Sequence, residues 1–197
     1  MKMGTRDHFD AGYYQRFYGR HGVHDRRRIA HLATGVVGMC AWWGIKPRSV
    51  LDIGAGPGLW RDWFRVNHPS IKIVSTDVSE YACMRYGHEQ RDIATWRPAR
   101  SFDLVICHGV LQYLDDAACE QAIDHIASAT RHVLYLEVPT THDFATVVDS
   151  SATDMQVHRR TGDWYREKLS AGFTQAGAGL WIRHGSVILY ELEGAQG

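Results

Sequence analysis

The sequence has few cysteines, no long hydrophobic run and no excess of charge of either sign. Its four cysteines are Cys40, Cys83, Cys107 and Cys119. They contain no CxxC pair, which argues against a disulfide framework or a zinc knuckle and fits a reducing cytoplasm. No apolar run reaches membrane-spanning length, and residues 1–10 lack the apolar core of a signal peptide, so we expect neither. The 22 basic and 22 acidic residues balance, so no net charge draws the chain to nucleic acid or an anionic membrane.

A metal site is not expected either. His21 and His24 have the spacing of a ligand pair, but Gly22 lies between them and no cysteine or acid cluster accompanies them. Residues 26–28 are three arginines that open a predicted helix. A run of this kind is typical of a solvated helix face, so we expect no nucleic acid partner.

Strand and helix patterns alternate along the chain. Helices are expected over 25–44, 59–67, 115–130 and 163–171, with a short one near 79, an irregular stretch before 163, and a short aromatic helix or pair of turns over 8–20. Strands are expected over 49–53, 71–76, 89–92, 102–107 and 133–138, with closing strands at 173–182 and 186–192. This alternation predicts an α/β fold with a mostly parallel sheet, an antiparallel C-terminal edge hairpin and helices on both faces. We expect one domain over 1–197, with 1–46 as an N-terminal helical cap and 47–197 as the cofactor-binding core.

The most informative run is a strand that ends in three glycines. Val50, Leu51 and Ile53 form the apolar strand, and Gly54, Gly56 and Gly58 follow it before the helix over 59–67. Glycine lets backbone approach a ligand closely, and the helix behind the turn directs unpaired N–H groups at that ligand. The pattern predicts a nucleotide-like cofactor at the carboxyl end of a parallel sheet.

The glycine spacing bears on which nucleotide binds. Dinucleotide enzymes use G-x-G-x-x-G, whereas here the third glycine, Gly58, comes one residue early. Tyr165 and Lys168 are one residue too close for a Tyr-x-x-x-Lys reductase motif. Asp77 could accept the ribose hydroxyls of either cofactor class, and Asp92 could accept an amino N–H from adenine. Either acid could instead be a solvated loop residue.

Four motifs in order resemble those of the class I S-adenosylmethionine-dependent methyltransferases. They are the glycine loop, Thr76-Asp77-Val78-Ser79, Arg91-Asp92, and Phe102–Val105 leading to Val110–Leu114. The resemblance spans roughly residues 48–193, and residues 9–18 also resemble the N-terminus of a bacterial subgroup without an assigned substrate. It implies a Rossmann-like seven-stranded sheet, S-adenosylmethionine as cofactor and S-adenosylhomocysteine as product.

The resemblance also assigns roles to residues at the cofactor. Asp52 would orient the methionine ammonium, Asp77 would bind the ribose, and Asp92 with the backbone of Ile93 would meet adenine. The remaining predicted cofactor contacts are Gly54, Ala55, Gly56, Gly58, Val78, Cys107 and His108.

The sequence says less about the acceptor site than about the cofactor site. Candidate catalytic bases are His108, Glu137 and His142, because each follows a central strand or lies in the loop beyond it. His108 could equally pack against the cofactor, Glu137 could bond loop amides, and His142 could be an exposed loop residue. Predicted substrate contacts are Tyr13, Tyr14 and Tyr18 as a lid, together with Arg159 and Trp164. Helix packing for the tyrosines and a solvated loop for the other two remain open.

These expectations give a leading function and two rivals. We expect methyl transfer to an oxygen or nitrogen atom of a small molecule, with secondary metabolism as one setting and no membrane or nucleic acid partner. The rivals are a catalytically silent S-adenosylmethionine-binding partner protein and an NAD-dependent oxidoreductase. The chain would be a cytoplasmic monomer or homodimer, with Trp42 or Trp181 exposed at an interface.

Overall fold

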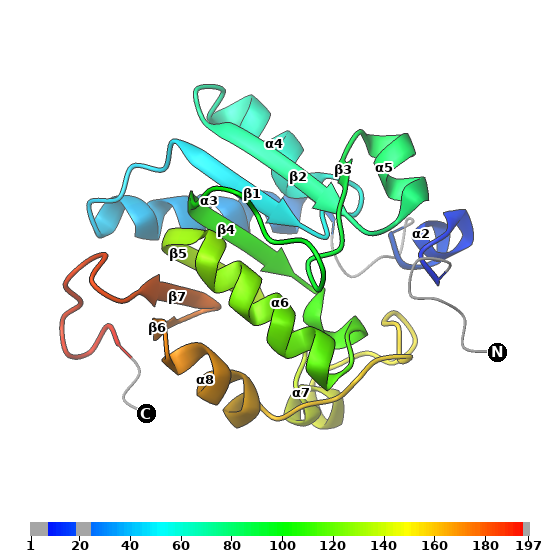
Figure 1. Cartoon of the computed structure of the whole chain (residues 1–197). Helices are drawn as coiled ribbons and strands as arrows, with labels where there is room; N and C mark the ends of the chain where they lie inside the picture. The colour runs from blue at the N-terminus through cyan, green and yellow to red at the C-terminus, as the bar shows by residue number, and fades with distance from the viewer. Residues whose placement is uncertain (1–7, 19–24, 195–197) are drawn as a thin grey trace.

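The described residues, 8–18 and 25–194, are built around a seven-stranded sheet in this computed structural model (Figure 1). The strands are β1 (Ser49–Ile53), β2 (Lys72–Asp77), β3 (Glu89–Gln90), β4 (Phe102–His108), β5 (Thr130–Glu137), β6 (Phe173–Gly177) and β7 (Leu180–Arg183). Their order is β3-β2-β1-β4-β5-β7-β6; the pairs from β3 to β5 are parallel, and β7 is antiparallel to both β5 and β6. The predicted Rossmann-like sheet with an antiparallel edge is confirmed.

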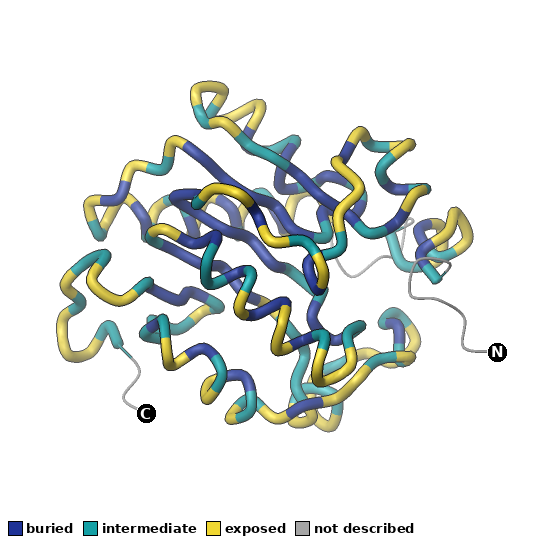
Figure 2. The backbone as a smooth tube through the Cα atoms, in the orientation of Figure 1, coloured by how far each residue is buried: buried dark blue, intermediate teal, exposed yellow. Residues whose placement is uncertain are grey.

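Helices cover both faces of this sheet. They are α2 (Ala11–Tyr18), α3 (Arg26–Trp42), α4 (Leu59–Asn67), α5 (Glu80–Tyr86), α6 (Asp116–Ala129), α7 (Thr141–Thr146) and α8 (Gly162–Ser170), with a 3-10 turn η1 (Leu111–Tyr113). Val50 and Leu104 pack in the core with α3 and α4, while Leu51 and Val105 pack in the core with α6 and α8. Successive strand residues point to opposite faces, so β1 and β4 each contribute to two cores, and β1 is buried along its whole length (Figure 2).

Local capping signals set the helix starts. Asp25 caps α3 by accepting the Arg28 backbone N–H at 2.7 Å, and Ser79 and Asp115 cap α5 and α6 in the same way. A reciprocal capping box between Thr140 and Asp143 begins α7, a helix that the apolar pattern does not predict. α2 and α3 precede the first strand, and the division into a cap over 1–46 and a core stays a prediction.

The predicted closing strands, 173–182 and 186–192, have the wrong bounds. Gly177, Ala178 and Gly179 have φ values of 84°, 49° and 77°, so the chain turns back inside the first predicted strand. The hairpin is therefore β6 followed by β7, and residues 186–192 are not a strand.

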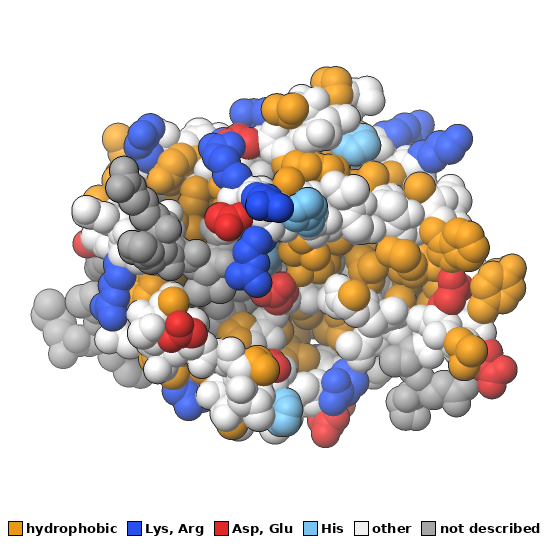
Figure 3. Space-filling model, turned by 180° about the vertical axis from the view of Figure 1, so that it is seen from behind, with side chains coloured by type: hydrophobic (Ala, Val, Ile, Leu, Met, Phe, Trp, Pro, Cys, Tyr) orange, Lys and Arg blue, Asp and Glu red, His pale blue; other side chains and the backbone are white. Residues whose placement is uncertain are grey.

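The prediction of exposed tryptophans is right for Trp42 and wrong for Trp181. Trp42 is 68% exposed, and its indole N–H donates to Glu193 Oε1 at 2.6 Å. Trp181 lies on β7, which turns its ring into the core and leaves it 5% exposed. Seen from behind, hydrophobic side chains are distributed over much of this face of the molecule, among polar and charged ones (Figure 3). Within the described part of the chain, no helix combines the length and apolar character needed to cross a bilayer.

Candidate active site

The carboxyl ends of β1, β2, β4 and β5 share one edge of the sheet, and α2 and α7 lie beside that edge (Figure 1). The glycine loop leaves β1 at this edge. Gly54 has φ of 63°, and a Cβ placed on it would lie 2.4 Å from Val110 Cγ2. Gly58, at φ of 78°, is the N-cap of α4, and its Cβ would lie 2.5 Å from Arg61 Nη2. Both positions therefore require glycine, for conformation and for space.

Asp77 is the last residue of β2, and its carboxylate bonds to the glycine loop. Its Oδ2 accepts the Gly56 N–H at 2.8 Å, and its Oδ1 accepts the Ser79 N–H at 2.9 Å. The residue is 5% exposed. Burial raises the pKa of the Asp77 carboxyl, and the two N–H bonds oppose part of that rise.

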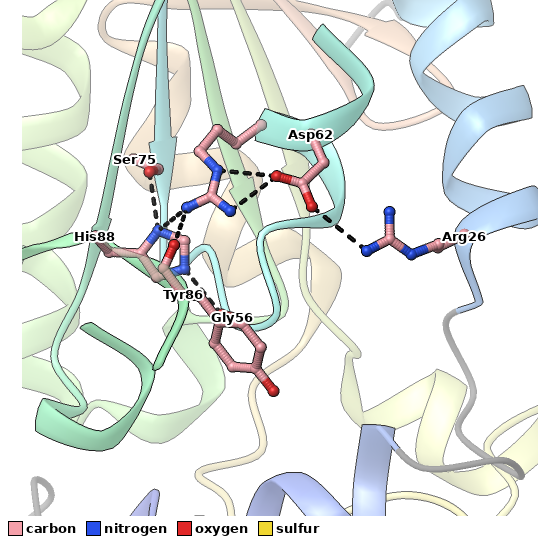
Figure 4. A network of polar contacts seen from close by, with 7 residues as sticks. Arg26, Gly56, Asp62, Ser75, Tyr86 and His88 are labelled. Atoms are coloured by element: carbon pink, nitrogen blue, oxygen red, sulfur yellow. Dashed lines mark hydrogen bonds and ion pairs between the residues drawn. The ribbon is translucent and has the colours of Figure 1, made fainter. Parts of the chain in front are cut away.

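A buried polar network also bonds to the glycine loop, at the carbonyl oxygen of Gly56 (Figure 4). His88 Nε2 lies 2.9 Å from the Gly56 carbonyl oxygen, and its Nδ1 lies 2.8 Å from Ser75 Oγ. Arg61 lies 3.2 Å from the same Nδ1 and pairs with Asp62 at 2.8 Å. Burial lowers the pKa of His88, so the ring is neutral and Nε2 donates to Gly56. Gly56 is thus fixed at its N–H by Asp77 and at its carbonyl by His88.

Arg61 and His88 are functional candidates that motif reasoning missed. They lie 27 positions apart in sequence and meet only in the folded chain. The amphipathic pattern of α4 gives one signal, because Arg61 falls on its buried face beside Trp60 and Phe64.

Asp52 is a buried carboxylate with an unsatisfied oxygen. It is 2% exposed, and its Oδ2 has no hydrogen-bond partner among the described residues. Burial, and then the negative charge of Asp77, raises the pKa of Asp52 to about 8, while Arg61 opposes the shift. A buried polar atom without a partner is costly, so this oxygen is suited to a cationic or N–H-bearing ligand.

Three clefts open around these residues. The β2 cleft, of about 580 Å³, includes Ile53, Gly54, Gly56, Asp77, Val78, Arg91, Asp92, Ile93, Val110 and Tyr113 in its lining. The glycine-loop cleft is lined by Tyr18, Ile29, Asp52, Gly54, Ala55, Pro57, Leu59, Trp60 and His108. The β5 cleft, of about 1100 Å³, includes Tyr13, Phe17, Tyr18, His108, Gln112, Tyr113, Glu137, Asp143 and Asp154. Tyr18 lines all three clefts, so they meet at its side chain.

His108 and Glu137 form a pair between the glycine-loop and β5 clefts. His108 Nε2 lies 3.2 Å from Glu137 Oε1, and the Trp60 indole N–H donates to His108 Nδ1 at 3.1 Å. Because an indole N–H can only donate, Nδ1 is the accepting nitrogen of the ring, and Nε2, on the side of Glu137, carries the proton. Tyr135 donates to Glu137 Oε2 at 2.8 Å. The Glu137 side chain is 47% exposed and that of His108 is 9% exposed, so the carboxylate is the more open group.

α2 covers the meeting point of the clefts with aromatic side chains. Tyr13 Oη lies 2.7 Å from Tyr113 Oη, and Ser79 Oγ donates to the Phe9 carbonyl oxygen at 2.6 Å. Tyr14 is 6% exposed, whereas Tyr13 and Tyr18 are partly buried. The three predicted lid tyrosines therefore lie together at the clefts.

Several predicted site residues are not brought to these clefts. Cys107 is fully buried in the core with α6, because strand alternation turns it away from His108. His142 is exposed on α7, and Arg159 lies over the Phe144 ring at 4.6 Å. Trp164 packs against the α6 and α8 core, with Arg160 over its ring at 4.9 Å. None of these residues lines the three clefts.

Asp92 does line the β2 cleft, and its Oδ1 accepts the Ala94 N–H at 3.0 Å. His21 and His24 lie outside the described residues. Within the described ranges, no three His, Cys, Asp or Glu side chains are grouped as metal ligands would be.

Comparison with known proteins relates this site to one family. Residues 23–176 match the family described as a methyltransferase domain. Over 79 residues the chain is 32% identical to trans-aconitate 2-methyltransferase from Methylobacterium radiotolerans. That stretch is 36% of this chain and only 30% of the relative.

Solved structures share the fold. Magnesium protoporphyrin IX methyltransferase from Synechocystis PCC 6803 with bound S-adenosylhomocysteine has a TM-score of 0.60 and 17% identity, covering 90% of this chain and 97% of that one. A plantazolicin methyltransferase in complex with a triazolic desmethylPZN analog and S-adenosylhomocysteine has a TM-score of 0.62 and 13% identity, covering 85% and 72%. At these identities the likeness is one of fold.

Proposed function

The chain belongs to the methyltransferase-domain family and is an S-adenosylmethionine-dependent methyltransferase, and from this premise we propose that it methylates an oxygen or nitrogen atom of a small molecule. The observation that carries the proposal is the pair of buried carboxylates, Asp52 and Asp77, on either side of the glycine loop. The balanced charge of the chain supports a small acceptor over a nucleic acid. The proposal includes a cytoplasmic enzyme that acts as a monomer or homodimer.

The clefts fit the two halves of the cofactor. The β2 cleft would take adenosine, with Asp77 accepting from the ribose hydroxyls and Asp92 and Ile93 near adenine. The glycine-loop cleft would take the methionine half, with its ammonium satisfying Asp52 Oδ2. When bound, S-adenosylmethionine supplies a methyl group on a positively charged sulfur.

The reacting centre would lie where the three clefts meet. Tyr18 lines each of them, and its aromatic face would attract a positive sulfur, by about 1–2 kcal/mol in a site without water. The acceptor would enter through the β5 cleft, which reaches the same point at His108. Glu137 is the proposed group that takes the proton of the acceptor, and His108, also a base expected from the sequence, is proposed to orient Glu137. His142, exposed on α7, is the weakest of the three proposed bases.

Calorimetric titration with S-adenosylhomocysteine tests this proposal. We expect binding to the wild type, and Asp77→Ala should weaken it by about 1–3 kcal/mol, because the ribose loses an acceptor and Gly56 loses its partner. Asp124→Ala, on the exposed face of α6, is the matched control and should bind as the wild type does. Binding of NAD(H) but not of S-adenosylhomocysteine would overturn the proposal and favour the oxidoreductase.

A second measurement separates an enzyme from a silent binding protein. The wild type would be incubated with S-adenosylmethionine and a broad set of alcohols, acids and amines, and S-adenosylhomocysteine release would be followed. Acceptor-dependent release supports turnover, whereas tight cofactor binding with no release across the whole set favours the silent binder.

A further inference from the structure

The β5 cleft is the part of the molecule that would hold the acceptor, and its lining is acidic. Glu137, Asp143 and Asp154 contribute carboxylates, and none of the described lining residues is a lysine or arginine. Asp143 is bonded within the capping box of α7, and Asp154 pairs with His8 at 2.7 Å. Glu137 is exposed, whereas Asp143 is only partly exposed and Asp154 is buried, so Glu137 is the most accessible of the three carboxylates to an acceptor. A carboxylate or phosphate acceptor would meet like charge here, and no lysine or arginine among the described lining residues would balance it.

The β5 cleft also contains a buried side-chain amide whose oxygen accepts no hydrogen bond from the described residues. Gln112 is 7% exposed, and its Oε1 has no hydrogen-bond partner among the described residues. A carbonyl oxygen accepts hydrogen bonds and cannot donate them, so only a ligand that carries N–H or O–H groups satisfies it. This observation is independent of the cleft's charge and favours the same kind of ligand.

Aromatic rings form the third side of the cleft. Tyr13, Phe17, Tyr18 and Tyr113 all contribute to the lining. The faces of such rings attract cations within about 6 Å of the centroid. An ammonium group meets all three features, since it carries positive charge, donates N–H bonds and is favoured by aromatic faces.

We propose that the acceptor is an amine, that it binds as its ammonium ion between Glu137 and the rings of α2, and that it is methylated on nitrogen. This inference rests on the proposed function and narrows its oxygen-or-nitrogen choice to nitrogen. The ammonium loses a proton to the Glu137 carboxylate, and the freed nitrogen lone pair forms a bond to the methyl carbon. The carbon–sulfur bond breaks with its electron pair left on sulfur. The products are S-adenosylhomocysteine and the N-methylated ammonium ion.

His108 acts in this step as a positioning residue. The Trp60 N–H occupies the Nδ1 lone pair of His108, and Nε2 carries a proton on the side of Glu137, so the ring has no lone pair left to accept a proton. Tyr135 donates to one oxygen of Glu137 and His108 Nε2 lies 3.2 Å from the other, so both neighbours restrict how the carboxylate is oriented at the cleft.

Matched compounds test the class of acceptor. Two series would be used, one of 2-phenylethylamine, 2-phenylethanol and 3-phenylpropanoate, the other of hexylamine, hexanol and hexanoate. Thermal shift of the S-adenosylhomocysteine complex should rise with the amine of each series and not with the carboxylate, and with S-adenosylmethionine the amine should give the most product. Equal effects, a preference for the alcohol or carboxylate, or no effect from any member overturns the inference. If S-adenosylhomocysteine itself binds, the proposed function stands regardless of that outcome.

Glu137→Gln tests the role of the carboxylate. At pH 7 it should lower amine methylation on the order of a hundredfold, because a carboxamide cannot take the proton. The loss should shrink at pH 10, where solvent removes the proton from much of the amine, and S-adenosylhomocysteine affinity should not change. Asp124→Asn removes an acid outside the clefts and should behave as the wild type at both pH values. A Glu137→Gln loss that is the same at pH 7 and pH 10 contradicts the proton-accepting role.

Discussion

Tyr13 and Tyr113 bring their hydroxyl oxygens to 2.7 Å across 100 residues of sequence. Tyr13 comes from α2 and Tyr113 from η1, so their bond ties the N-terminal helix to the segment after β4. Burial raises the pKa of both phenols, which are therefore neutral at ordinary pH. Both rings line the β2 and β5 clefts, so this one bond positions the walls of the cofactor and acceptor sites together.

A double-mutant cycle of Tyr13→Phe and Tyr113→Phe measures that bond. Each single change leaves one hydroxyl without its partner, and we expect a coupling free energy of about 1 kcal/mol in urea unfolding. S-adenosylhomocysteine affinity should fall in each variant, because α2 docks less firmly over the β2 cleft. Tyr190→Phe, at a side chain that is 74% exposed, is the control. Strictly additive single effects would mean that α2 is held by ring packing alone.

Asp52→Asn should stabilise the cofactor-free protein at alkaline pH and should weaken cofactor binding. The pKa of Asp52 is about 8 in the folded chain against 3.8 ordinarily. Between these values the folded state holds a proton that the unfolded state has lost, so the free energy of unfolding of the wild type falls as pH rises toward 8. Asparagine has no proton to lose, so the fall between pH 5 and pH 8 should be smaller in the variant. Denaturant unfolding at both pH values measures it.

The same variant separates stability from binding. A neutral carboxamide cannot form a charged pair with the methionine ammonium, so calorimetry should show S-adenosylhomocysteine binding weaker by about 1.5–3 kcal/mol. An Asp52→Asn variant that keeps both the wild-type pH slope and the wild-type affinity would show that this carboxylate neither titrates in the folded state nor meets the ligand.

His88→Ala should loosen the glycine loop and change acid stability. Burial lowers the pKa of His88 below 6.5, so in the interval just below 6.5 the unfolded state binds more protons than the folded state. The free energy of unfolding of the wild type should therefore fall as pH drops through that interval, and this slope should flatten in the variant. At pH 7.5 we expect a loss of about 1–3 kcal/mol, because Gly56 and Arg61 lose a buried partner.

The control for that change is His31→Ala, at an exposed position on α3. It should alter neither the pH slope nor the affinity for S-adenosylhomocysteine, whereas His88→Ala should lower the affinity. Full affinity in His88→Ala would show that Asp77 alone fixes Gly56.

Features that depend on neighbours in sequence could be predicted, and those that depend on distant partners could not. The glycine loop, the Ser79 cap and the strands β1 to β5 follow from short patterns, and the structure has them close to where they are expected. The contact between Arg61 and His88 joins α4 to the segment before β3, and no local sequence pattern predicts that these two residues meet. Cys107 is a different case, because the alternation of strand residues already separates it from His108, and that alternation was the available signal.

Gly54→Ala should weaken cofactor binding, and comparison with alanine at a second glycine, Gly44, should show why. Gly44 and Gly54 both have positive φ, 73° and 63°, so alanine at either position brings conformational strain of about 1 kcal/mol or more. An added Cβ meets nothing within 4 Å at Gly44, but at Gly54 it lies 2.4 Å from Val110 Cγ2. Both variants should lose stability, and Gly54→Ala should lose more.

Gly44→Ala and Gly54→Ala should differ more in their affinity for S-adenosylhomocysteine than in their stability. Gly54 lines the β2 and glycine-loop clefts, so a displaced Val110 or a shifted loop closes the passage between the adenosine and methionine halves. Calorimetry should show S-adenosylhomocysteine binding at wild-type strength in Gly44→Ala and weaker by more than about 1.4 kcal/mol, a factor of ten, in Gly54→Ala. Adding Val110→Ala to Gly54→Ala removes the clashing methyl and should recover part of the lost stability. If Gly54→Ala binds as tightly as Gly44→Ala, close approach at this glycine is not what the cofactor requires.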